Sequence, residues 1–280
     1  MAVTPPRVYY HYTPSLPAAI VAVVVFFVLF SLHTFKLFKT RTWFCTPFVI
    51  GALFEIIGYA GRAYAHTHTD SKPVYIVQTL FILLAPILFA ASIYMFLGRI
   101  IRSTGLNSLS IVRPTWLTKI FVGGDILCFL VQALGAIILT TSDTSDGVNR
   151  GKAIVLVGLV LQIIFFGFFV VTGLVFHMKA RKKQASSRFD WQKYMNWLYA
   201  VSAIITARNI YRVVEYVQGV NGYLMTHEWS IYTFDALLMA TVLGLVQMWY
   251  LGNDVANKDG HQDLEMIADH GREPYRQTGH

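Results

Sequence analysis

Seven apolar runs, each close to the length of a membrane-spanning helix, constrain the fold of this 280-residue chain most strongly. A helix needs ~20 residues to cross a hydrocarbon core about 30 Å thick. With 55% hydrophobic and 14% charged residues, the chain is more apolar than soluble globular domains. We therefore predict an all-α polytopic membrane protein, a bundle of seven transmembrane helices. The predicted spans are 17–38, 46–64, 74–98, 117–140, 153–178, 194–218 and 231–251.

The remaining residues form two flanking segments and short loops, with no soluble domain. Residues 1–16 are predicted to be an N-terminal lead and residues 17–251 the transmembrane domain. Residues 252–280 are polar and lack apolar periodicity, so a disordered tail is predicted there. No small-residue cleavage site follows the first run, and we interpret that run as a retained span.

Lysine and arginine concentrate in alternate loops. Cytoplasmic loops of membrane proteins carry an excess of these residues. The first, third and fifth loops are therefore predicted to be cytoplasmic, with the N-terminus outside and the C-terminus cytoplasmic. This topology explains the net charge of +8, and no nucleic-acid partner is predicted. The basic residues of the three loops are Lys36, Lys39 and Arg41, then Arg99, Arg102 and Arg113, then Lys179, Arg181, Lys182, Lys183, Arg188 and Lys193.

The sixth run carries charges at bilayer depth. Arg208, Arg212 and Glu215 are spaced i, i+4 and i+7, which places them on one helix face. Ionised side chains inside a membrane cost several kcal/mol unless they are paired or hydrated. This face is therefore predicted to line a polar interior.

Other spans carry matching polar residues. Glu55, Tyr59 and Arg62 repeat the same spacing in the second run, and Pro86 interrupts the third. A proline inside a span frees a backbone carbonyl and bends the helix. The complete set of predicted substrate-binding residues is Glu55, Tyr59, Arg62, Gln78, Tyr94, Asp125, Gln132, Gln162, Arg208, Arg212, Glu215, Tyr232 and Asp235.

The topology assigns depths to these residues. Arg62, Gln78, Arg212, Glu215 and Asp235 are predicted in an outer layer, Glu55 and Arg208 near mid-membrane, and Asp125 in the inner half. The set is interpreted as the wall of an outward-biased polar cavity. Two alternatives stay open: buried Arg–Glu pairs can simply fix helix register, and buried glutamines are a common packing device between helices.

Metal and cofactor sites are not predicted. Cys45 and Cys128 lie in different apolar runs, which argues against both a disulfide and a cysteine-based metal site. His66 and His68 have no evident third ligand. The chain has no nucleotide-binding motif, so ATP-driven pumping by this chain alone is not expected.

Several ordered blocks between about residues 20 and 250 resemble the fungal RTA-like, or lipid-translocating exporter, family of seven-span membrane proteins. They are FEIIGYAGR at 54–62, the segment from Gln78 to Pro86, the segment 89–101, FVGGDI at 121–126 with Gln132, the segment 158–162, RNIYRVVEY at 208–216, and positions between Gly219 and Asp235.

The resemblance implies a lipid or amphiphile translocator, with a sphingoid long-chain base, a sterol-like compound or a porphyrin as substrate. It also implies the plasma membrane or, in some members, an endomembrane. Two other functions stay open from the residues themselves. A buried acid such as Glu55 or Asp125 suits a membrane enzyme acting on a lipid or isoprenoid substrate, and seven spans with an outside N-terminus match receptor topology. The sequence gives no indication of the oligomeric state.

Overall fold

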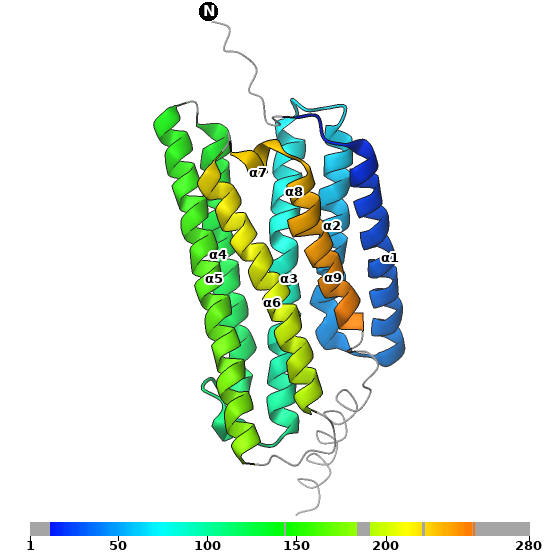
Figure 1. The fold of residues 1–280 in the computed structure, drawn as a ribbon, viewed down its shortest axis with the longest axis vertical. Coiled ribbons are helices and arrows are strands. Elements are labelled where there is room, and N and C mark those ends of the chain that lie inside the picture. The colour runs from blue at the N-terminus through cyan, green and yellow to red at the C-terminus, as the bar shows by residue number, and fades with distance from the viewer. Residues whose placement is uncertain (1–11, 143, 184–190, 220–221, 248, 250–280) are drawn as a thin grey trace, which may run out of the picture.

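A computed structural model describes residues 12–142, 144–183, 191–219, 222–247 and 249. Long helices run up and down in one bundle (Figure 1). Six of them are α1 (Leu16–Thr40), α2 (Thr46–Ala65), α3 (Lys72–Ser103), α4 (Pro114–Thr141), α5 (Ser145–Lys182) and α6 (Trp191–Gln218). The seventh segment joins α8 (Trp229–Ile231), the π-helical turn η3 (Tyr232–Ala236) and α9 (Leu237–Val246). Short helical turns are η1 (Trp43–Cys45), η2 (Asn107–Leu109) and α7 (Tyr223–Thr226).

These helices confirm the predicted all-α class, since the described part of each predicted span falls on one helical segment and no strand occurs in the described ranges. The first four helices share a proline in their first turn: Pro17, Pro47, Pro73 and Pro114. Proline suits this position because its missing N–H has no helical partner there and its fixed φ matches the helix. The predicted tail, 252–280, lies outside the described residues.

Six of the described segments are long and apolar enough to cross a membrane by length and composition alone. The segment that does not meet this criterion is α6, although it has 28 residues and packs inside the bundle. Its buried face carries Arg208, Arg212 and Glu215, as the i, i+4, i+7 spacing predicted. The sixth span is therefore recognised by its place in the bundle rather than by its hydropathy.

The helices form a ring in chain order, closed by contact between α1 and α9. Helix α3 contacts α2, α4, α5 and α6, and Figure 1 shows it behind the diagonal of α6. Aromatic rings fill the interior near the α1–α2 connection, where Phe96 stacks on Trp249 with centroids 4.0 Å apart. Outward-facing apolar residues such as Val21, Phe35 and Ile164 are exposed, as expected of a surface that faces lipid.

Residues 12–15 and the α2–α3, α4–α5 and α6–α8 connections lie at one end of the bundle, which we call the N-terminal end (Figure 1). The basic loops after α1 and α3 lie at the opposite end. The sequence-based orientation, N-terminus outside, stays a prediction.

Candidate functional site

Asp235 of η3 accepts hydrogen bonds from both arginines of α6. Arg208 Nε donates to Asp235 Oδ1 at 2.6 Å, and Arg212 Nη2 donates to Asp235 Oδ2. Arg208 and Asp235 are 0% exposed and Arg212 is 6% exposed. A single carboxylate thus joins two guanidinium groups in the interior, where burying either charge alone would cost several kcal/mol.

Glu215 balances the second arginine. Arg212 Nη1 donates to Glu215 Oε2 at 2.9 Å, one turn along the same helix. The Tyr211 hydroxyl lies 3.2 Å from Glu215 Oε1 and 3.4 Å from Ser230 Oγ. We call Arg208, Arg212, Glu215 and Asp235 the central network. It contains two positive and two negative groups, which explains how α6 tolerates its charges.

A backbone carbonyl of α3 completes the surroundings of Arg208. Its Nη2 donates to the carbonyl oxygen of Ile82 at 3.1 Å. Pro86 follows Ile82 by four residues and has no N–H to donate to that carbonyl. The proline that the sequence marked as freeing a carbonyl therefore supplies an acceptor for the buried guanidinium.

The seventh segment changes from α- to π-helix where it carries Tyr232 and Asp235. Such turns are rare and frequently occur at functional sites. The predicted site residues of this segment thus lie in the part of the backbone that departs from regular α-helix.

Glu55 of α2 lies beside the central network without bonding to it. It is 0% exposed, and neither carboxyl oxygen has a hydrogen-bond partner. Asp235, Arg208 and Arg212 are close enough to act on its charge. Tyr59, one turn further along α2, is also 0% exposed and has an unpartnered hydroxyl.

A second cluster closes the N-terminal end above the central network. Arg62 Nη2 donates to Glu228 Oε1 at 3.0 Å and to the Tyr12 hydroxyl at 2.6 Å, while its Nε donates to the Tyr232 hydroxyl at 3.1 Å. The backbone N–H of Ser15 lies 2.8 and 2.9 Å from the two Glu228 oxygens. We call Arg62, Tyr12, Ser15, Glu228 and Tyr232 the Arg62 cluster. It ties the chain before α1 to the start of the seventh segment.

The remaining predicted residues form separate pairs. Tyr94 donates to Asp125 Oδ2 at 2.7 Å, linking α3 to α4, and Gln132 Nε2 donates to Gln162 Oε1 at 2.9 Å, linking α4 to α5. Gln78 is buried against Gly61 of α2. The glutamine pair matches the packing alternative recognised in the sequence.

The histidines and cysteines considered in the sequence as metal ligands or disulfide partners have other surroundings in the structure. His66 Nδ1 lies 2.7 Å from the Pro14 carbonyl, and the His68 ring stacks on Tyr64. Cys45 and Cys128 are buried and unbonded to each other. Across the described ranges, no group of three or more His, Cys, Asp or Glu side chains is placed to hold a metal ion.

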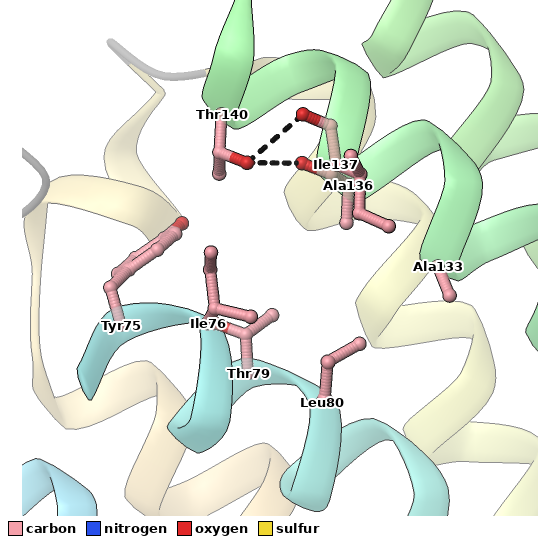
Figure 2. Close-up of a pocket in the computed structure, with 8 residues that line it drawn as sticks. All are labelled: Tyr75, Ile76, Thr79, Leu80, Ala133, Ala136, Ile137 and Thr140. Atoms are coloured by element: carbon pink, nitrogen blue, oxygen red, sulfur yellow. Dashed lines mark hydrogen bonds between the residues drawn. The ribbon is translucent and has the colours of Figure 1, made fainter. Parts of the chain in front are cut away.

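A small apolar pocket lies between α3 and α4 (Figure 2). Its volume is about 20 Å³, room for about one water-sized molecule. The Thr140 hydroxyl at its edge bonds to the carbonyls of Ala136 and Ile137, at 2.9 and 3.0 Å. None of the predicted site residues lines this pocket, which is formed by Tyr75, Ile76, Thr79, Leu80, Ala133, Ala136, Ile137 and Thr140.

Sequence reasoning missed several partners in these clusters. Glu228 was not among the predicted site residues because it precedes the seventh apolar run, yet it binds Arg62. Its position in a connection at the same end as Arg62 is the signal that could have identified it. Tyr12, Tyr211 and Ser230 gave no comparable signal, because hydroxyl residues are common near span ends.

The family described as "RTA1 like protein" matches residues 48–258. Protoporphyrin uptake protein 1 of Saccharomyces cerevisiae is 34% identical, covering 84% of this chain and 89% of that protein. Protein RTA1 of the same yeast is 34% identical, covering 82% and 80%. Sphingoid long-chain base transporter RSB1 of the same yeast is 25% identical, and the match covers 91% of this chain and 78% of that protein.

No solved structure matches the chain. The family match covers the whole central network and, of the Arg62 cluster, Arg62, Glu228 and Tyr232. With seven helical segments and an apolar outer surface, the protein is an integral membrane protein, and it belongs to the RTA1-like protein family.

Proposed function

We propose that this protein translocates a lipid or other amphiphile across a membrane, with the headgroup passing through the central network. The observation that carries the proposal is the buried, balanced set of charges contributed by α6 and η3 inside an apolar bundle. The relatives support it, since one is named a sphingoid long-chain base transporter and another a protoporphyrin uptake protein. The relatives do not favour the membrane-enzyme and receptor alternatives.

The chemistry of the interior suits a polar headgroup joined to an apolar tail. Carboxylates such as Glu55 and Glu215 suit an amine, and the guanidinium groups of Arg62 and Arg212 suit a phosphate or carboxylate. Apolar faces such as that of α1 leave room for the tail to stay in hydrocarbon. Tyr94, Asp125, Gln132 and Gln162 bond in two separate pairs rather than to the central network, so the proposed path of the headgroup does not include them.

Translocation requires the interior to open, because the central network is closed to solvent in this conformation. The Arg62 cluster covers the N-terminal end, so separating Arg62 from Glu228 would expose the layer beneath it. We place this end outside the cell, following the basic loops at the other end. The plasma membrane is the proposed location.

The test uses purified protein in liposomes. A sphingoid base labelled with a fluorophore at the end of its tail is loaded symmetrically, and an impermeant quencher reports how fast the inner-leaflet fraction reaches the outer leaflet. Wild-type protein is expected to accelerate this exchange over protein-free liposomes. A tail-labelled phospholipid and a tail-labelled fatty acid serve as alternative cargoes. If none of the three moves faster with wild-type protein, the proposed function is wrong.

Matched variants locate the path. Asp235→Asn removes the carboxylate shared by both arginines and is expected to slow exchange at least about tenfold, which corresponds to losing ~1.4 kcal/mol of stabilisation. Asp146→Asn makes the same chemical change at an exposed position of α5 and is expected to behave as wild type. Arg212→Lys serves as a second variant that keeps the charge. Wild-type rates in both central variants, each eluting as a folded species, would contradict the assignment of the path.

A further inference from the structure

Glu55 is the surplus acid of the buried interior. The two guanidinium groups of Arg208 and Arg212 are matched by the carboxylates of Asp235 and Glu215. Glu55 is a third carboxyl group beside them, fully buried and without a hydrogen-bond partner on either oxygen. If it is ionised, the group as a whole carries one uncompensated negative charge.

Glu55 is surrounded by charged, polar and apolar side chains from the neighbouring helices. Helix α6 presents Arg208 and Arg212, η3 presents Asp235, and α2 itself adds Tyr59 one turn away. The flanking helices face this level with apolar side chains: Ile82 of α3 meets Gly58, and Phe26 of α1 stacks on Tyr59 with centroids 5.6 Å apart. Two guanidinium nitrogens, Arg208 Nη1 and Arg212 Nε, are also without a partner.

A buried carboxylate that lacks a partner is costly, on the order of several kcal/mol. Two species can remove that cost by adding one positive charge: a proton on the carboxyl group, or a cation that sits against it. A proton needs no further ligand. A cation needs acceptors, and here Glu55 Oε1, Glu55 Oε2 and Tyr59 Oη are three unpartnered oxygens on one face of α2.

Three acceptors match the hydrogen-bonding capacity of a primary ammonium group, which has three N–H donors and no acceptor. A metal ion is a poorer match, because no group of three candidate ligand residues was found among the described side chains. The unpartnered guanidinium donors could in addition bind a hydroxyl next to the amine. The arrangement thus suits an amphiphile whose headgroup is a primary amine.

We infer that Glu55 is an exchange site, which holds a proton when the interior is empty and releases it when the ammonium group of an amphiphile binds. The exchange balances as Glu–COOH plus R–NH₃⁺ giving Glu–COO⁻···⁺H₃N–R plus one H⁺, with no covalent bond formed to the ligand. The inference rests on the proposed function for the identity of the cargo. It adds that amine entry is coupled to the departure of one proton.

The binding test does not depend on transport. Dicyclohexylcarbodiimide adds to protonated carboxyl groups in apolar surroundings, and mass spectrometry then identifies the modified residue. Wild-type protein in detergent is expected to be modified at Glu55, and modification should fall as pH rises. Octadecylamine is expected to slow modification at least about tenfold at saturation, the change that ~1.4 kcal/mol of binding corresponds to. Octadecanol, with the same chain and no amine, is expected to leave it unchanged.

Asp125 provides an internal control in the same experiment. It is another buried carboxyl, 1% exposed, but its Oδ2 accepts the Tyr94 hydroxyl and it lies on α4. Octadecylamine should not alter its modification. The inference is overturned if Glu55 is not modified, or if the rate of its modification changes with neither pH nor octadecylamine. Equal protection of Asp125 also overturns it, because the amine would then act on the whole protein.

A stability measurement separates exchange from a structural ion pair. Glu55→Gln keeps the shape and the neutral state of the protonated carboxyl group, so the variant should unfold at the wild-type temperature or above it. If Glu55 were paired with the free Arg208 nitrogen, Glu55→Gln would lower the unfolding temperature, as we expect of Asp235→Asn. That result contradicts the inference.

Transport then distinguishes the two proposals. Liposomes containing a pH-sensitive dye are expected to report proton movement opposite to the tail-labelled base in wild type, and none in Glu55→Gln. Movement of the base without proton counterflow overturns the coupling and leaves the proposed function standing. Protection of Glu55 by octadecylamine without movement of any cargo supports the exchange site and overturns the proposed function.

Discussion

Arg208 donates a hydrogen bond to the backbone carbonyl of Ile82, the carbonyl that Pro86 leaves without its helical partner. The two features depend on each other. Without Arg208, the Ile82 carbonyl that Pro86 leaves unbonded would be a buried acceptor with no donor. Without that free carbonyl, Arg208 would have one fewer acceptor for its buried N–H groups. A break in α3 and a charge in α6 are therefore one structural unit.

The first prediction concerns this unit. Arg208→Lys keeps the charge, but a single ammonium group cannot reproduce the planar donor set that spans Asp235 and Ile82. We expect the unfolding free energy to fall by about 2–4 kcal/mol. In a Pro86→Ala background, the new N–H satisfies Ile82, so the same lysine substitution should cost about 1 kcal/mol less. A double-mutant cycle of unfolding in detergent measures the difference, and strict additivity would contradict the coupling.

The second prediction ranks the acids of the central network. Asp235→Asn leaves two guanidinium groups short of a carboxylate, and we expect a loss of about 3–5 kcal/mol in unfolding free energy. Glu215→Gln should cost less, because Glu215 pairs with Arg212 alone and is 6% exposed. Thermal unfolding of both variants beside Asp146→Asn provides the comparison. A reversed order would show that Glu215 is the principal counter-ion.

Much of this arrangement followed from spacing in the sequence. The i, i+4, i+7 pattern placed Arg208, Arg212 and Glu215 on one face, and these three side chains are indeed buried together. The same pattern placed Glu55, Tyr59 and Arg62 on the inner face of α2. Helical periodicity is local, so the chain order alone fixes which residues share a face.

Partners across helices could not be predicted in this way. The bond between Arg62 and Glu228 joins residues 166 positions apart, and the sequence indicates only that both lie at the same end of the bundle. The π-helical turn at Tyr232–Ala236 was also not predicted, because the apolar pattern of the seventh run does not distinguish a π-helical turn from regular α-helix. The outward-biased polar cavity stays a prediction, and in this conformation the charges of α6 and η3 are paired, which lowers the cost of burying them.

The third prediction concerns the N-terminal end. Glu228 accepts the backbone N–H of Ser15, so Glu228→Ala should release the segment before α1. A cysteine introduced as Ser15→Cys should then react with an impermeant maleimide severalfold faster than in the Glu228 parent. Labelling of the two native cysteines by the maleimide should be low, because Cys45 and Cys128 are buried.

Ser145→Cys, exposed at the same end, is the control and should react equally in both backgrounds. Labelling on intact cells additionally tests whether this end faces outside. An unchanged rate at position 15 would show that Glu228 does not hold this segment.

The fourth prediction concerns the contact of α4 with α5. A Cβ atom at Gly151 would lie 2.6 Å from the backbone nitrogen of Leu139, so the two helices would have to separate. Gly151→Ala is therefore expected to cost about 1–3 kcal/mol of stability. Gly123→Ala, on exposed α4 surface with nothing within 4 Å, should be neutral or slightly stabilising. Thermal unfolding of the two variants measures the difference, and an equal loss of stability in both would contradict a packing role for Gly151.

The pairing of Arg208 and Arg212 with Asp235 also has a consequence for biosynthesis. Helix α6 falls below the hydropathy criterion that the other six spans meet, and the carboxylate that Arg208 and Arg212 share is synthesised 27 residues after Arg208. The ribosome therefore exposes Arg208 well before its counter-ion Asp235, whereas Arg212 has Glu215 on the same helix. We expect helix α6 to enter the lipid together with the seventh segment, because pairing with Asp235 lowers the cost of burying its arginines.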